Sequence, residues 1–133
     1  MTENEIAKAV VDAAYRTHVM WGPGLLESAY QAVLVHELRM RGLRVEDEIP
    51  VPVVWDGVHI DIGFRADLII ENKLIVELKS VEGVVPVHKK QLLTYLRLTN
   101  CRLGLLINFG ASLIKDGITR VVNGLPEDDA AEE

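Results

Sequence analysis

The chain has 133 residues, of which 49% are hydrophobic and 26% are charged. These values predict one globular domain over residues 1–125, followed by an acidic tail over residues 126–133 whose composition predicts disorder. Hydrophobic residues never run for the roughly 20 positions of a membrane span, and the N-terminus lacks the basic start of a secretory signal, so we expect no membrane partner. The single cysteine, Cys101, excludes an internal disulfide framework and is consistent with a cytoplasmic location.

Most of the net charge of −6 belongs to the tail. Its five acidic residues carry −5, which leaves −1 for the rest of the chain. A nearly neutral body lacks the basic surface of a tight non-specific nucleic-acid binder. We therefore expect any contact with phosphate to be weak or metal-dependent.

Helical signals mark three segments. Thr2 and Glu5 have the spacing of a capping box, and hydrophobic residues at helical spacing follow them. Gly22-Pro23-Gly24 ends this first segment, Gly42 suits the C-terminal end of the second, and Pro86 suits the first turn of the third. The predicted helices cover Glu3–Met20, Leu25–Arg41 and Pro86–Thr99.

The order of helices and strands predicts an α/β layer architecture with a central mixed β-sheet. Pro50 and Pro52 confine the first strand to an edge or an irregular position, and Asp56-Gly57 is a strong hairpin turn. The continuous hydrophobic run near the C-terminus is typical of a strand buried on both faces. The predicted strands cover Val45–Trp55, Val58–Ile62, Phe64–Ile70, Leu74–Lys79, Leu103–Phe109 and, around Asp116-Gly117, Ile114–Val122.

The hairpin formed by Phe64–Ile70 and Leu74–Lys79 carries the most informative polar residues. Strand side chains alternate, so Glu77 and Lys79 share one face. Asp67 joins that face only if it pairs opposite Glu77, which requires an odd-length connection or a bulge at Asn72-Lys73. Directly opposed residues have Cβ atoms about 4.5–5.5 Å apart, which lets two carboxylates share one cation. The alternative is a solvated strand face with ordinary ion pairs.

Two further groups of polar residues each have an ordinary structural explanation when that group is considered alone. His88, Gln91 and Tyr95 form one stripe on the third helix, which is usually its wet side. Glu27 lies in the first turn of the second helix, where the helix dipole alone favours an acid, beside a tyrosine, Tyr30, expected to be half-buried. Trp21 is expected to pack at the corner between the first two helices, and Trp55 at the end of a strand.

Three motifs, taken together, resemble those of a known family. Asp67, then nine residues, then Glu77-x-Lys79 is similar to the PD-(D/E)XK nuclease superfamily, with Ala66 where its name has proline. Gln91-x-x-x-Tyr95 resembles the extra motif of the RecB-type branch. Gly24-x-x-Glu27-x-x-Tyr30 resembles the signature of the GxxExxY protein family, small chains assigned to that superfamily.

The resemblance implies a restriction-endonuclease-like core, with a central mixed β-sheet flanked by helices. It also implies a Mg²⁺ site, with Mn²⁺ as an alternative ion, held by Asp67, Glu77 and the backbone carbonyl of Leu78. Glu27 matches an additional acid that some members turn toward the metal. Lys79 would position or help to deprotonate the attacking water, and Gln91 and Tyr95 would orient Lys79, the water or the phosphate.

Two functions follow as expectations. The first is a Mg²⁺-dependent nuclease that hydrolyses phosphodiester bonds, with DNA as the expected substrate. The second is a non-catalytic module on a nuclease-like fold that binds nucleic acid or a protein. Little surface remains for reading bases, so a sequence-specific restriction enzyme is less expected, and a protein partner or homo-oligomer could supply the missing surface.

Overall fold

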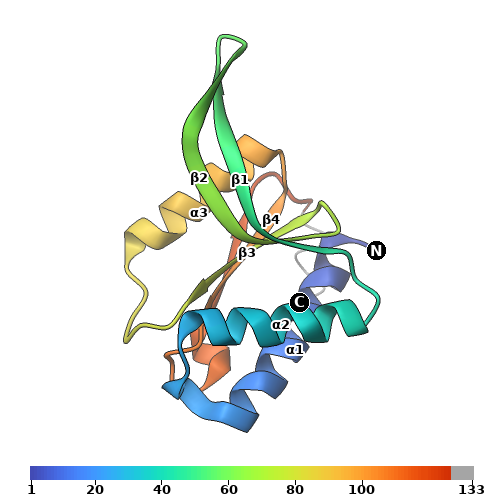
Figure 1. The fold of residues 1–133 in the computed structure, drawn as a ribbon, viewed down its shortest axis with the longest axis vertical. Coiled ribbons are helices and arrows are strands. Elements are labelled where there is room, and N and C mark those ends of the chain that lie inside the picture. Colours follow the sequence, from blue (N-terminus) through green and yellow to red (C-terminus); the bar gives the residue numbers. More distant parts are fainter. Residues whose placement is uncertain (127–133) are drawn as a thin grey trace.

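The computed structural model describes residues 1–126, so the expected acidic tail lies almost wholly outside the described residues. A mixed sheet of five strands in the order β1-β2-β3-β4-β5 forms the centre of the molecule (Figure 1). Neighbouring strands are antiparallel except β3 and β4, which are parallel and are connected through α3. This arrangement confirms the predicted α/β class. The strands are β1 (Val45–Trp55), β2 (Val58–Ile70), β3 (Leu74–Lys79), β4 (Leu103–Asn108) and β5 (Ile118–Val122).

Three helices cover the two faces of the sheet, as predicted. The Thr2 hydroxyl accepts the N–H of Glu5 at 3.2 Å and the Glu5 carboxylate accepts the N–H of Thr2 at 2.8 Å, which is the expected capping box. Asn100, at φ 59°, ends the third helix in the left-handed conformation. No helix among residues 1–126 combines the length and the hydropathy that a membrane crossing requires. The helical segments are α1 (Glu3–Trp21), η1 (Gly22–Gly24), α2 (Glu27–Met40), α3 (Pro86–Thr99) and η2 (Ile114–Gly117).

Alternation along β3 divides the core into two clusters. Leu74, Val76 and Leu78 pack with α1 and α2 on one face of the sheet, whereas Ile75 packs with Leu92 and other residues of α3 on the other. The odd-numbered residues Glu77 and Lys79 therefore belong to the α3 side of the sheet.

The predicted break between two strands at Gly63 is wrong, because β2 runs without interruption from Val58 to Ile70. A Cβ atom at Gly63 would lie 2.0 Å from the carbonyl oxygen of Val51, so this glycine lets the neighbouring strand approach closely instead of ending its own. The Asp56-Gly57 turn is confirmed. The hairpin of β1 and β2 extends well beyond the rest of the molecule (Figure 1), and residues 54–61 are exposed.

Two smaller expectations are also wrong. Trp55 and Trp21 do not pack, since their exposed fractions are 70% and 58%. Trp55 lies at the end of the long hairpin, where no other element is near enough to cover it, and Trp21 is the last residue of α1. The start of the last predicted strand is a 3-10 turn, η2, in which Gly117 is buried. A Cβ atom at Gly117 would lie 2.2 Å from the Asn108 carbonyl oxygen, so the glycine lets this turn approach the end of β4 closely.

Candidate active site

The candidate site lies where β2 and β3 separate. The ladder between these strands contains three pairs, from Leu68 opposite Val76 to Ile70 opposite Leu74. The loop that joins them, Glu71 to Lys73, has an odd length and places Ile69 opposite Ile75, as predicted. Beyond the ladder β2 continues only with β1, and β3 continues with β4. We call the point of separation the fork.

Two carboxylates replace the backbone hydrogen bonds that the fork removes. Glu77 Oε1 accepts the backbone N–H of Asp67 at 3.2 Å, and Asp67 Oδ2 accepts the backbone N–H of Leu78 at 2.8 Å. Each side chain thus reaches across to the backbone of the opposite strand. The two carboxyl groups therefore meet across the gap between the strands, one residue beyond the last ladder pair of Leu68 and Val76.

Burial makes both carboxylates costly in their charged form. Desolvation raises the pKa of Glu77 to about 8, and the charge of Asp67 adds to this shift, while the N–H of Asp67 and the Lys79 ammonium act against it. Burial also raises the pKa of Asp67, although the N–H of Leu78 lowers it. A pair of desolvated carboxylates is suited to a divalent cation, which replaces the proton that one of them would otherwise hold.

The end of β3 is held in place by β4. Asn108 is buried and pairs opposite Lys79, and its side-chain amide accepts the Val81 N–H at 3.0 Å and donates to the Val81 carbonyl at 2.9 Å. Lys79 is half-buried, and its charge lowers the pKa values of Asp67, Glu77 and Glu27. Within the described part of the chain Lys79 makes no ion pair within 4 Å, so its ammonium is available to another anion.

Helix α3 brings a tyrosine to the fork. The ring of Tyr95 stacks on Phe64 of β2, with 3.4 Å between ring centroids and 4° between planes. Burial raises the pKa of Tyr95, and the charges of Glu77 and Asp67 add to the effect.

Gln91 lies one turn earlier and is exposed, without a hydrogen bond to the fork among the described residues. His88 has a local role, since its Nδ1 accepts the N–H of Val85 at the start of α3.

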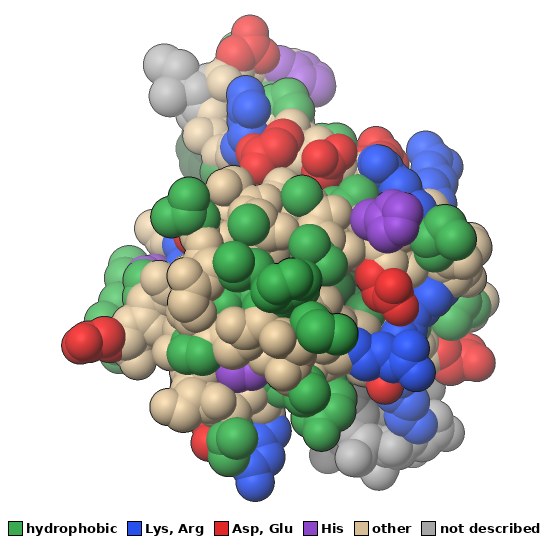
Figure 2. Space-filling model, turned by 60° about the horizontal axis from the view of Figure 1, so that its bottom comes forward, with side chains coloured by type: hydrophobic (Ala, Val, Ile, Leu, Met, Phe, Trp, Pro, Cys, Tyr) green, Lys and Arg blue, Asp and Glu red, His purple; other side chains and the backbone are tan. Residues whose placement is uncertain are grey.

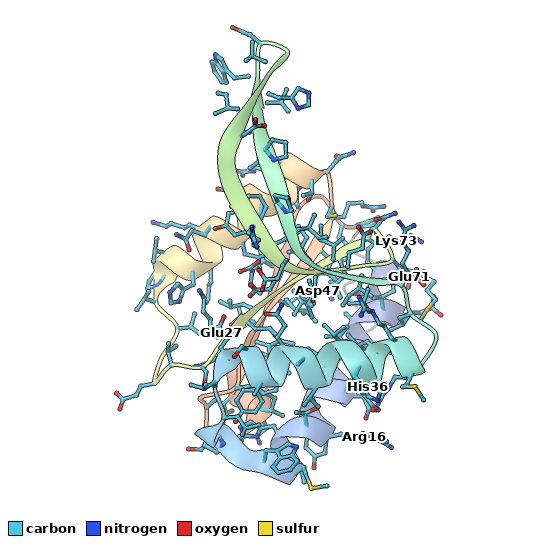
Figure 3. All side chains as sticks on the ribbon, viewed as in Figure 1. Arg16, Glu27, His36, Asp47, Glu71 and Lys73 are labelled. Atoms are coloured by element: carbon cyan, nitrogen blue, oxygen red, sulfur yellow. The ribbon has the colours of Figure 1, made fainter. Side chains whose placement is uncertain are left out.

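Helix α2 contributes Glu27 from the other face of the sheet (Figure 3). Its carboxylate lines a hollow of about 380 Å³ together with Asp67 and Glu48. Burial raises the pKa of Glu27, with the charge of Asp67 as the next cause. Glu27 therefore lies within electrostatic reach of the fork.

Tyr30 fixes the turn that precedes Glu27. The expectation of a half-buried tyrosine is wrong: Tyr30 is fully buried and stacks on Phe109 with 4.2 Å between ring centroids. Its hydroxyl donates to the Gly22 carbonyl and accepts the N–H of Leu25 at 3.1 Å. The tyrosine of the Gly24-x-x-Glu27-x-x-Tyr30 motif thus acts on backbone, and holds the segment from which Glu27 projects.

Glu48 is a residue of this site that the sequence patterns do not indicate. It interrupts the ladder of β1 and β2 between Asp47 and Ile49, at the position opposite Asp67, and has a left-handed φ of 51°. Its Oε1 accepts the side-chain amide of Gln31 at 2.9 Å. Its charge contributes to the raised pKa values of Asp67 and Glu27. An acid within an ordinary edge strand gives no local signal of this placement.

The donor set for a metal is therefore small. Among residues 1–126, no three His, Cys, Asp or Glu side chains are arranged to hold an ion, so Glu27 does not complete a ready set with Asp67 and Glu77. A backbone carbonyl is the remaining donor. The N–H and C=O of one strand residue point to the same neighbouring strand, and the Leu78 N–H points to Asp67, so the Leu78 carbonyl also faces the fork. Oxygen donors of this kind suit Mg²⁺ or Mn²⁺.

A mixed sheet with two carboxylates and a lysine at the separation of two strands defines a nuclease-like α/β class. A family model described as PD-(D/E)XK nuclease superfamily matches residues 4–121. The chain belongs to the PD-(D/E)XK nuclease superfamily. Searches of curated proteins and of solved structures found no match.

Proposed function

We propose that this protein is a Mg²⁺-dependent nuclease that hydrolyses phosphodiester bonds, with DNA as its substrate. The observation that carries the proposal is the fork, where two half-buried carboxylates and a lysine meet at the end of β3. Membership of the superfamily supports it independently. The GxxExxY family, to which the Gly24, Glu27 and Tyr30 spacing points, is the more specific placement that we propose, with a cytoplasmic location.

Asp67, Glu77 and the Leu78 carbonyl would hold the ion, and the ion when bound supplies a Lewis acid and lowers the pKa of a bound water. Their hydrogen bonds across the fork fix the two carboxylates before substrate arrives. Glu27 and Glu48 add negative charge around the hollow that Asp67 also lines, and this charge attracts a cation and repels phosphate until the cation is present.

The side chains toward α3 handle the phosphate and the water. Lys79 offers its ammonium to the scissile phosphate and to the attacking water, because it has no carboxylate partner within 4 Å among the described residues. Tyr95 is fixed by its stack on Phe64, and its raised pKa keeps the hydroxyl protonated and able to donate. Gln91, one turn before it, reaches the outer side of the same phosphate.

The test is cleavage of single-stranded, duplex and branched DNA, and of RNA, by the wild type and Glu77→Ala with Mg²⁺ or Mn²⁺. Cleavage by the wild type only, abolished by chelator, supports the proposal. If neither protein cleaves any substrate, and both bind nucleic acid equally in chelator, the protein is a binding module. A match between wild type and Glu77→Ala in cleavage rate would place the activity elsewhere.

A further inference from the structure

The outer part of the long hairpin, residues 53–61, has one hydrophobic face; we call it the arm. Trp55 pairs opposite Val58, and Val53 pairs opposite Ile60, so these four side chains point to the same side. Three of them are well exposed, at 70% for Trp55, 60% for Val58 and 41% for Ile60. A two-stranded ribbon alone is only marginally stable in water, and a bare hydrophobic face on it marks an interaction surface.

The charge of the arm argues against nucleic acid as its partner. Residues 53–61 include Asp56 and Asp61 and contain no lysine or arginine. A hairpin that enters a groove of DNA needs cations for the phosphates on either side. A partner that matches the arm should instead have a surface that is hydrophobic at its centre and positively charged at its rim.

The chain itself carries such a surface on α1, β4, β5 and η2, and none of the fork residues lines it. A cavity of about 590 Å³ there has a hydrophobic floor and two lysines, Lys8 and Lys115, which are exposed and make no ion pair among the described residues. Its single acid, Asp12, is already bound to Arg41 at 2.7 Å. The floor includes Val11, Tyr15, Leu105, Ile114 and Ile118.

We propose that the arm of one molecule docks in this cavity of a second copy of the chain, so that two copies exchange arms. Trp55 and Val58 enter the hydrophobic floor, and Asp56 at the tip of the turn meets Lys8 and Lys115. Two identical contacts related by a twofold axis give a closed dimer and bring the pair toward the roughly 1,200–2,000 Å² of a specific interface.

The experiment measures the mass of the full chain by light scattering and sedimentation, without metal or nucleic acid. We expect twice the chain mass of 14.8 kDa at about 100 µM, a concentration above the dissociation constant of a micromolar contact. Trp55→Ala is expected to raise the dissociation constant at least about tenfold, as for other buried interface tryptophans. Because catalysis is not measured, failure of this proposal leaves the proposed function intact.

The matched control is the other exposed tryptophan. Trp21 belongs to a second group of exposed hydrophobic residues near the end of α1, with Val19, Met20 and Leu26. Figure 2 shows that the face it brings forward carries a patch of hydrophobic side chains. Trp21→Ala should leave the dimer unchanged. A dimer that is lost with Trp21→Ala but kept with Trp55→Ala would assign the interface to that second group and overturn the proposal.

A double-mutant cycle tests the charged contact. Lys115→Glu should weaken the dimer in the wild-type background, and its effect should shrink when combined with Asp56→Asn, which keeps the turn and removes the charge. Equal effects of Lys115→Glu in both backgrounds would contradict this contact.

Fluorescence reports where Trp55 goes. In the Trp21→Phe background Trp55 is the only tryptophan, and its emission should shift to the blue as concentration rises. A chain that is monomeric at every concentration overturns the proposal, as does a blue-shifted emission that dilution does not change, which would mean docking within one molecule. An unchanged mass of Trp55→Ala together with weaker DNA binding would assign the arm to nucleic acid.

Discussion

The inner and outer halves of β2 have different surroundings, although both consist largely of alternating strand-forming residues. The inner half lies between β1 and β3 and is covered by helices, so Ala66, Leu68 and Ile70 are fully buried. The outer half pairs only with β1, and Val58 and Ile60 are exposed. The lesson is that a carboxylate gains unusual properties from its position along the strand: Asp67 at the fork has a raised pKa, whereas Asp61 six residues earlier lies in water.

The largest expected effect separates these two aspartates in catalysis. Asp67→Asn should lower the rate of Mg²⁺-dependent cleavage about a thousandfold, which corresponds to about 4 kcal/mol of transition-state stabilisation. Asp61→Asn, the same change on the same strand, should leave the rate within about twofold because this side chain lies in water on the outer half of β2. Steady-state rates on the best substrate test both, and equal losses would remove the distinction between fork and arm.

The same contrast applies to stability. Leu68→Ala should lower the free energy of unfolding by about 2–5 kcal/mol because it leaves a cavity in the core. Val58→Ala should change it by less than about 0.5 kcal/mol, measured by urea unfolding at a concentration well below the dissociation constant of the dimer, where self-association contributes little. A comparable loss for Val58→Ala would mean that the arm is packed in solution.

Loss of the Tyr30 hydroxyl should be smaller but should affect both stability and the site. Tyr30→Phe keeps the stack on Phe109 and leaves the Gly22 carbonyl and the Leu25 N–H without their partner, at a cost of about 1–3 kcal/mol. Because the turn before Glu27 loosens, Mg²⁺ affinity by calorimetry should fall a few-fold. An unchanged affinity at lower stability would show that Glu27 does not influence the ion.

A further expected effect is the dependence of the free energy of unfolding on pH in the absence of metal. The carboxyl of Glu77 titrates near 4.5 when unfolded and at about 8 when folded, so between these values the folded protein binds more protons. The free energy of unfolding should therefore fall as pH rises from about 5 to 8. Each kcal/mol lost should lower Tm by about 4 °C.

Glu77→Gln is the control for this pH dependence, since the amide cannot titrate. Its Tm should vary less between pH 5 and 8, and added Mg²⁺ should restore the wild type most at the upper end of the range, where the ion replaces the missing proton. A wild-type Tm that rises with pH over this window would contradict the assignment of the shift to Glu77.

Much of the backbone was predictable because its causes are local. The capping box of Thr2 and Glu5, the turn at Asp56-Gly57 and the Pro86 start of α3 all act within a few residues. The alternation of strand side chains predicted that Glu77 and Lys79 share a face, and the odd loop around Asn72 sets Ile69 opposite Ile75, the register that leads toward Asp67 and Glu77. The strand register that leads to the candidate site therefore follows from the sequence, and the roles of its side chains stay predictions.

The sequence by itself determined which residues share a strand face, because strand and helix periods are properties of the local chain. Only the tertiary structure decided which faces meet. Tyr95 reaches the fork through its stack on Phe64, and Glu48 lies opposite Asp67 through a left-handed backbone angle. The high pKa of Glu77 is likewise a product of packing, since desolvation depends on every element that removes water from the carboxylate.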